Sequence, residues 1–178
     1  MVTTIRDFLP FGDIGPELLQ RVANDRPGLP VDDLAAVFAL GKAAVSMFDL
    51  IAEPLGDAGL SPARWRLLMT LRFQSIPEGA SVSEIAGHLE IREPTVTSTV
   101  DRAVRDGLVE RRKDPDDRRV TRVVLTSAGH DMIERMFPKV LGRLMSFSAA
   151  MGGPQSIREI TEHLERSVEA AIPAERKR

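Results

Sequence analysis

Apolar residues recur every three or four positions along several stretches of this chain, which is the period of an amphipathic helix. The pattern predicts a helix of about six turns over residues 32–55 and another helix over residues 61–73. A long helix follows Thr126, and we expect Pro138 to bend or interrupt it. In a last helix, beyond Gly153, the apolar residues repeat about every 3.5 positions, the spacing of a seam for a partner helix. These seam residues are Ile157, Ile160, Leu164, Val168 and Ala171.

Two short helices are predicted between residues 81 and 106. Ser81 and Glu84 form a capping box, in which each side chain accepts the backbone N–H of the other residue. This box starts a helix that runs to Leu89. Pro94 then opens a second helix, which runs to about residue 106 and which Gly107 ends.

Two strands follow this pair of helices. They are predicted at Val109–Lys113 and Thr121–Leu125, and the residues DPDD between them suit a tight turn. The order of helix, helix and hairpin fits a helix-turn-helix followed by a β wing. Such a unit places its second helix in a DNA groove.

The second short helix has two unlike faces. Its apolar residues fall on one side and predict burial, while Thr95, Ser98, Arg102 and Arg105 fall on the other, with Thr99 near the boundary. Short hydroxyl side chains let a helix approach base edges, a threonine methyl can contact thymine, and arginine can bind guanine. The alternative is a threonine-rich helix that is merely half exposed. The candidate DNA-contacting residues of this helix are Thr95, Thr97, Ser98, Thr99 and Arg102.

The hairpin supplies a second group of candidates. Arg112, Arg118 and Arg119 are expected to reach phosphates or the minor groove beside the helix, as are the neighbouring cations Arg111, Lys113 and Arg122. Asp117 precedes Arg119 by two positions, so its carboxylate is expected to hold that guanidinium or the neighbouring one in a bidentate pair.

Composition narrows the function classes. The 178 residues are 43% hydrophobic and 28% charged, which is ordinary for a soluble globular protein. There is no cysteine, which excludes disulfides, thiolate catalysis and cysteine-ligated metals within the chain. The net charge is −2, so DNA binding must depend on where the charges lie. The apolar runs look too short to cross a bilayer, and no secretory signal is visible, so we expect a cytoplasmic protein without membrane contact.

An enzyme is the main alternative that the sequence disfavours. The three histidines lack metal-binding spacing, and there is no phosphate-binding glycine loop or nucleophile elbow. We therefore expect no catalytic residue, no metal and no cofactor.

Several segments together resemble the MarR (multiple-antibiotic-resistance regulator) family. They are RWRLL at 64–68, SVSEIAGHL, PTVTSTVDRAVRDGLVERR and, above all, DPDDRRVTRVVLTSAG. The resemblance implies a mostly α fold with a small β-hairpin wing, in which a winged helix-turn-helix lobe is joined to a helical dimerisation lobe. The implied divisions are an N-terminal extension (1–31), a dimerisation helix (32–60), the DNA-binding lobe (61–126) and C-terminal dimerisation helices (127–178).

The resemblance also implies a mechanism. A homodimer would bind a pseudo-palindromic double-stranded DNA operator, with Arg119 at the wing tip in the minor groove and Asp117 bracing the wing. A small phenolic or aromatic carboxylate effector would release a repressor from that operator, and Trp65 and Arg66 lie where its pocket is expected. Two other functions stay open: a metal-responsive regulator of the same fold, and a dimeric scaffold that does not bind DNA. The operator, the regulated genes and the role of residues 1–31 are not predicted.

Overall fold

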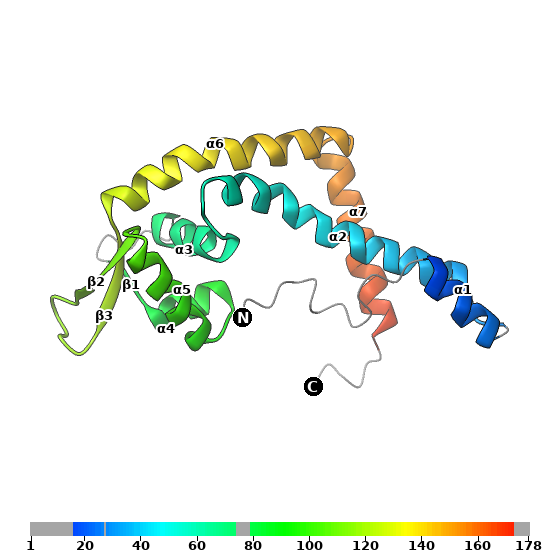
Figure 1. Ribbon diagram of the computed structural model, residues 1–178, viewed down its shortest axis with the longest axis horizontal. Coiled ribbons are helices and arrows are strands. Elements are labelled where there is room, and N and C mark those ends of the chain that lie inside the picture. Colours follow the sequence, from blue (N-terminus) through cyan, green and yellow to red (C-terminus); the bar gives the residue numbers. More distant parts are fainter. Residues whose placement is uncertain (1–15, 27, 74–78, 173–178) are drawn as a thin grey trace. The chain divides into compact units, whose positions relative to one another are not determined.

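The computed structural model describes residues 16–26, 28–73 and 79–172. Most of these residues are helical, and three short strands form one sheet (Figure 1). The elements in chain order are α1 (Pro16–Asp25), α2 (Val31–Asp57), α3 (Pro62–Phe73), β1 (Ala80–Ser81), α4 (Val82–Leu89), α5 (Glu93–Arg105), β2 (Val109–Lys113), β3 (Thr121–Leu125), α6 (Ser127–Ala150) and α7 (Pro154–Ala171).

The chain divides into two compact units, Met1–Glu53 and Pro54–Arg178, and the boundary falls within α2. The first unit contains α1 and most of α2. Within the predicted N-terminal extension, residues 1–15 lie outside the described residues, and α1 occupies part of the remainder. The second unit contains every element of the predicted helix-turn-helix and wing. Its division into dimerisation and DNA-binding lobes stays a prediction.

Helix α2 corrects one sequence-based expectation. Among the described residues it is the one helix long and apolar enough to cross a membrane by length and composition, and none of its apolar window is buried. The prediction that every apolar run is too short was wrong, because it counted uninterrupted runs and ignored that a helix tolerates a few polar residues. In α2 the apolar side chains Val37, Leu40, Met47 and Phe48 are exposed.

The core of the second unit lies between the sheet and three helices. Strand β3 is central in an antiparallel sheet of order β1-β3-β2, and α3, α4 and α5 pack on one another beside it (Figure 1). Helix α6 packs on α3 and β3. The largest fully buried side chains of this core include Leu67, Leu68, Ile85, Val96, Val100, Val123, Ile133 and Met136. Strand β1, which the sequence did not predict, pairs Ala80 with Val123 and Ser81 with Arg122.

Helix α6 continues through Pro138, so the expected interruption does not occur. A proline removes one N–H bond to the carbonyl four residues earlier. Met136 and Val140, which flank Pro138, are both buried. Their packing against the core holds the helix across the missing bond.

Candidate nucleic-acid interface

Helix α5 presents the predicted polar face to solvent. Val96, Val100 and Ala103 are buried, while Thr95, Thr97, Ser98 and Arg102 are exposed and Thr99 is partly exposed. The helix begins after Arg92, which has extended backbone, and Pro94 lies in its first turn, where a missing N–H costs nothing. It ends at Arg105, and Gly107 follows the C-cap with a positive φ of 71° that suits glycine. The apolar stripe therefore fixes which side chains face outward.

The hydroxyl groups of α5 bond to the helix itself. Thr97 Oγ1 donates to the Glu93 carbonyl at 3.0 Å, and Thr99 Oγ1 donates to the Thr95 carbonyl at 2.9 Å. Ser98 Oγ also donates to the Thr95 carbonyl, at 3.0 Å. Because their protons are engaged, these oxygens face outward as acceptors. An arginine adds a strong hydrogen-bond donor for a base or phosphate.

Arg102 can supply that donor. Its side chain is exposed, and within the described part of the chain the guanidinium groups of Arg102 and the neighbouring Arg105 have no hydrogen-bonding or ionic partner. The nearby Arg111, by contrast, pairs with Asp101 at 2.7 Å. The outward face of α5 thus combines small oxygen acceptors with an uncommitted guanidinium.

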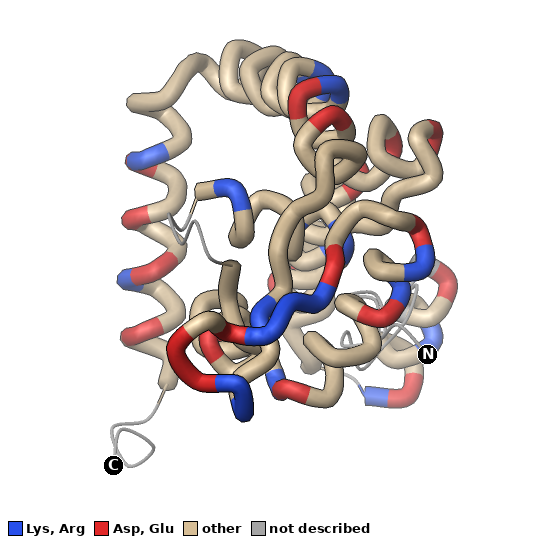
Figure 2. The backbone as a smooth tube through the Cα atoms, turned by 90° about the vertical axis from the view of Figure 1, so that its left-hand side faces the viewer, with Lys and Arg blue, Asp and Glu red and all other residues tan. Residues whose placement is uncertain are grey.

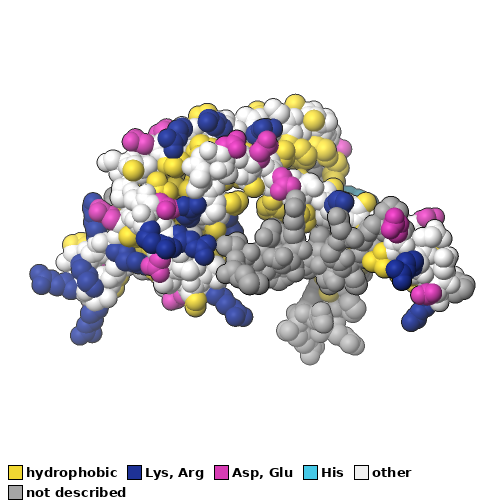
Figure 3. Space-filling view, viewed as in Figure 1, with side chains coloured by type: hydrophobic (Ala, Val, Ile, Leu, Met, Phe, Trp, Pro, Cys, Tyr) yellow, Lys and Arg dark blue, Asp and Glu magenta, His cyan; other side chains and the backbone are white. Residues whose placement is uncertain are grey.

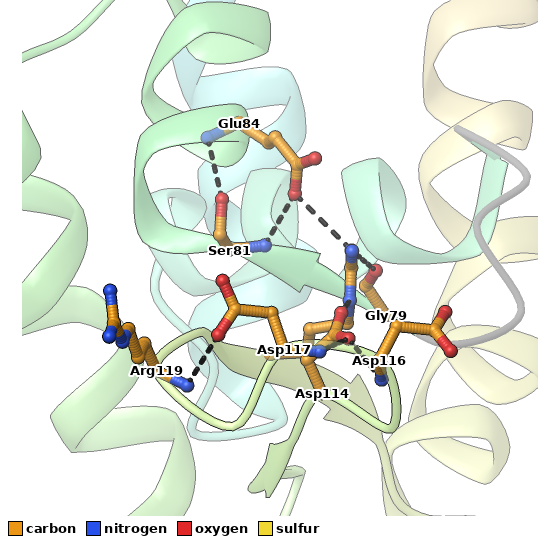
Figure 4. A network of polar contacts seen from close by, with 8 residues as sticks. Gly79, Ser81, Glu84, Asp114, Asp116, Asp117 and Arg119 are labelled. Atoms are coloured by element: carbon orange, nitrogen blue, oxygen red, sulfur yellow. Dashed lines mark hydrogen bonds and ion pairs between the residues drawn. The ribbon is translucent and has the colours of Figure 1, made fainter.

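The wing turn is organised by Asp114, the one charged side chain that is buried among the described residues. Its Oδ1 accepts the backbone N–H groups of Asp116 at 2.8 Å and Asp117 at 2.9 Å, and its Oδ2 pairs with Arg122 (Figure 4). The backbone N–H of Asp117, followed by the Arg122 guanidinium and the N–H of Asp116, lowers the pKa of Asp114 to about 2. Sequence reasoning placed Asp114 in this turn but did not predict its burial or its pair with Arg122.

Arg122 was expected to reach DNA with the other hairpin cations, but its side chain is only 22% exposed and bonds within the unit. Its guanidinium points into the unit: it pairs with Asp114, donates to the Gly79 carbonyl at 3.0 Å and lies 3.5 Å from Glu84 Oε2. The cause is its place on the central strand β3, because pairing with Ser81 of β1 brings the Gly79 carbonyl and Glu84 of α4 next to this side chain. The predicted capping box of Ser81 and Glu84 is present, and its bond to the Ser81 N–H lowers the pKa of Glu84.

Arg118 and Arg119 occupy the wing tip, and both are exposed. Asp117 Oδ1 accepts the backbone N–H of Arg119 at 2.9 Å (Figure 4). The predicted bidentate pair with a guanidinium does not form in the described structure, because the turn directs this carboxylate to the backbone. Both tip guanidinium groups therefore stay available. Arg112 is exposed on β2 and donates from Nε to Glu110 at 2.7 Å.

The basic side chains gather at the hairpin end of the second unit. Figure 2 shows Lys and Arg along the hairpin, interrupted by acidic residues of the turn, and Figure 3 shows their side chains projecting there. The net charge of the chain is −2, so this local excess arises from placement rather than composition. An exposed basic projection beside an exposed helix face is the form expected of a groove-binding surface.

The two predicted effector residues differ in exposure. Trp65 is buried in the core with 6% of its surface exposed, whereas Arg66 is exposed and donates to the Leu89 carbonyl at 3.2 Å. A cavity of about 480 Å³ lies elsewhere and does not include either residue. It is lined by Pro54, Asp57, Pro138, Lys139, Gly142, Arg143 and Ser146. Over the described ranges, no cluster of three or more potential metal ligands occurs.

The low pKa of Asp114 predicts an acid-dependent loss of stability. A carboxylate whose folded pKa lies below its unfolded value stabilises the fold above the unfolded pKa, and this contribution is lost as pH falls. The stabilising contribution is lost between about pH 4, the ordinary pKa of aspartate, and about pH 2, the pKa of Asp114 in the folded protein. Asp114→Asn should therefore be less stable than the unaltered protein at pH 7, and the difference should shrink as pH falls through this window. Urea denaturation at several pH values measures it.

Asp116→Asn is the matched control, because it removes an exposed carboxylate from the same turn. Its pH dependence should follow that of the unaltered protein. A stability difference for Asp114→Asn that stays constant from pH 7 to pH 2.5 would contradict the assigned role.

Comparisons with known proteins agree with this geometry. Residues 60–121 match the MarR family. The chain is 28% identical over 120 residues to the HTH-type transcriptional regulator PecS of Dickeya dadantii, covering 67% of this chain and 72% of PecS. It is 40% identical over 77 residues to the HTH-type transcriptional repressor IacR of Pseudomonas putida, covering 43% of this chain and 44% of IacR.

A solved structure shares the fold. It is a MarR family transcriptional regulator from Streptomyces coelicolor in complex with DNA, with a TM-score of 0.65 and 22% identity, covering 83% of this chain and 96% of that one. The matched residues 60–121 contain α3, α4, α5 and the wing hairpin up to the start of β3. Residues 60–121 thus match the MarR family, and the chain is similar in sequence to HTH-type transcriptional regulators and in fold to a MarR family regulator that binds DNA.

Proposed function

We propose that this protein is a cytoplasmic, homodimeric repressor that leaves a pseudo-palindromic operator when a small phenolic or aromatic carboxylate ligand binds. The observation that carries the DNA-binding part is the combination of two uncommitted surfaces on the second unit. One is the outward face of α5 with Arg102, and the other is the wing tip with Arg118 and Arg119. Helix α5 would read base edges in the major groove while the tip enters the adjacent minor groove.

The unpartnered apolar surface of α7 supports a homodimer. No residue of this helix is buried, and Ile160, Leu164 and Val168 of the predicted seam are each exposed. A regular apolar stripe of this kind is stable in water only when another helix covers it. A two-fold axis would then set two recognition helices about one DNA turn apart.

Arg66 and Trp65 support the ligand part of the proposal. Arg66 uses one amino group on the Leu89 carbonyl, which leaves other donors of this exposed guanidinium for a carboxylate. Trp65 is buried in the core, so it would shape the site from behind rather than stack on a ligand in the free protein. IacR is named a repressor, and we propose the same direction of control here.

Binding of the 178-residue chain to a random DNA duplex at low salt tests the proposal. We expect measurable affinity that falls steeply as salt rises, because phosphate contacts release counterions. Sequence selection from the same library should then enrich a two-fold symmetric site. Binding that is absent or insensitive to salt would favour a dimeric scaffold, and binding lost after dialysis against a chelator would favour a metal-responsive regulator.

Arg119→Ala and Arg102→Ala should weaken DNA binding in different ways. The tip residue Arg119 is expected to contribute to all sequences alike, so its loss should lower affinity for the selected site and for random duplex by about tenfold each. Loss of Arg102 should lower affinity for the selected site by about tenfold and change random-duplex binding less. Titrations of both duplexes measure the two effects. Unchanged affinity of Arg119→Ala for the selected site would contradict the wing assignment.

A further inference from the structure

The wing is connected to the helix-turn-helix through the guanidinium of Arg122. This residue lies on β3, where it pairs with Ser81 of β1 on one side and Arg112 of β2 on the other. Its side chain is 22% exposed, whereas that of Arg112, its neighbour across the hairpin, is 66% exposed. Only one of the two cations at this level of the hairpin is therefore directed to solvent.

A continuous series of polar contacts runs from α4 to the wing tip (Figure 4). Glu84 of the α4 capping box lies 3.5 Å from Arg122, and Arg122 pairs with the buried Asp114. Asp114 accepts the N–H of Asp117, and Asp117 accepts the N–H of Arg119. Each step joins side chain to side chain or side chain to backbone, without a gap.

Close packing fixes the anchor of this series. Gly79, whose carbonyl accepts from Arg122 at 3.0 Å, has a φ of 86° and lies directly against Val123 and Val124. A Cβ at this position would overlap the Val123 carbonyl oxygen and the Val124 side chain. The backbone at Gly79 thus packs closely on β3, and Arg122 lies between the Gly79 carbonyl and the buried carboxylate of Asp114.

We propose that Arg122 is a positioning residue for DNA binding, which sets the wing-tip arginines Arg118 and Arg119 relative to α5 through Asp114 and does not itself contact DNA. This inference rests on the proposed DNA-binding function. A planar guanidinium is required, because Asp114, Gly79 and Glu84 lie in different directions around it. Lysine keeps the charge but offers a single ammonium, which cannot reproduce that arrangement.

The first test needs no DNA. Amide hydrogen exchange is measured for the unaltered 178-residue chain and for Arg122→Gln, Arg122→Lys and the matched control Arg111→Gln, which removes an exposed arginine of β2. We expect faster exchange at Asp116, Asp117 and Arg119 in both Arg122 variants and unchanged exchange there in Arg111→Gln. Circular dichroism melting shows that each variant is folded. Unchanged protection of the turn in folded Arg122→Gln would overturn the proposal, whether or not the protein binds DNA.

The second test is a thermodynamic cycle on a duplex selected by the unaltered protein. Arg122→Gln should weaken binding by about tenfold. It should also lower the slope of log K against log salt as much as the double variant Arg118→Ala/Arg119→Ala does. A direct phosphate contact would instead lower the slope of log K against log salt by about 0.9. In the background of the double variant, Arg122→Gln should have no further effect.

Three outcomes would overturn the inference. The losses of affinity from Arg122→Gln and from the double variant could be additive, Arg122→Gln could lower the slope of log K against log salt by only about 0.9, or Arg122→Lys could fully restore binding. Each would mean that the charge of Arg122 acts on DNA directly. If the unaltered protein selects no duplex, the proposed function fails, and the exchange experiment still decides whether Arg122 holds the wing.

Discussion

Gly129→Ala is expected to destabilise the protein by about 2 kcal/mol, although alanine is the better helix former. A Cβ on Gly129, in the first turn of α6, would overlap the Leu108 carbonyl oxygen and lie 3.1 Å from Leu125 Cδ2. The Leu108 carbonyl cannot withdraw easily, because it accepts the Thr126 N–H at 3.1 Å. Overpacking against backbone costs up to about 3 kcal/mol, whereas the gain in helix propensity is about 1 kcal/mol. The steric cost therefore dominates.

Gly142→Ala is the matched control on the same helix. A Cβ on Gly142 meets no atom within 4 Å, so only the propensity gain remains. We expect Gly142→Ala to be stabilised by about 0.5–1 kcal/mol. Urea denaturation of both variants measures the difference in the free energy of unfolding. Equal shifts for the two variants would show that the contact between α6 and Leu108 is not tight.

The Gly129 contact also bears on DNA binding. Leu108 joins the end of α5 to the start of β2, so it connects the proposed recognition helix with the wing. Thr126 holds this joint from the other side, since its Oγ1 donates to the Gly107 carbonyl at 2.6 Å. Displacement of α6 by an added methyl group would move the wing relative to α5. We therefore expect Gly129→Ala to lose DNA affinity even at temperatures where it is fully folded.

The features that the sequence predicted well are those determined within a few residues. The capping box of Ser81 and Glu84 is a contact between positions i and i+3, and it is present as predicted. Strands β2 and β3 have the predicted bounds, because the turn residues between them fix where pairing starts. The outward face of α5 follows from the spacing of its buried valines.

The features that the sequence did not reveal depend on contacts between distant segments. Arg122 and Gly79 are 43 positions apart, and nothing local distinguishes Arg122 from the arginines that stay exposed on the hairpin. Strand β1 has only two residues, too few for a periodic signal, and exists because β3 offers it a free edge. Pro138 was expected to bend or interrupt α6, and the helix is not interrupted because packing at Met136 and Val140 outweighs the local preference.

Leu164→Asp is expected to dissociate the proposed homodimer. Leu164 is 41% exposed in the single chain and lies in the middle of the apolar seam on α7. In a two-fold dimer the substitution would bury two carboxylates, and burial of an unpaired charge costs several kcal/mol for each. Sedimentation of the variant at micromolar concentration should show a monomer. The second unit should remain folded, because no residue of α7 is buried within the single chain.

Arg166→Asp is the matched control, since it lies on the opposite side of α7 and its pair with Glu162 is exposed. Although it changes the charge by more than Leu164→Asp does, it should leave the dimer intact. A dimer that survives Leu164→Asp would place the interface away from the seam.

Loss of the dimer should also weaken DNA binding. A monomer presents one α5 and one wing, so it can bind only half of a symmetric site. Affinity for the full selected site should then fall to that for an isolated half-site, while the salt dependence per half-site stays unchanged.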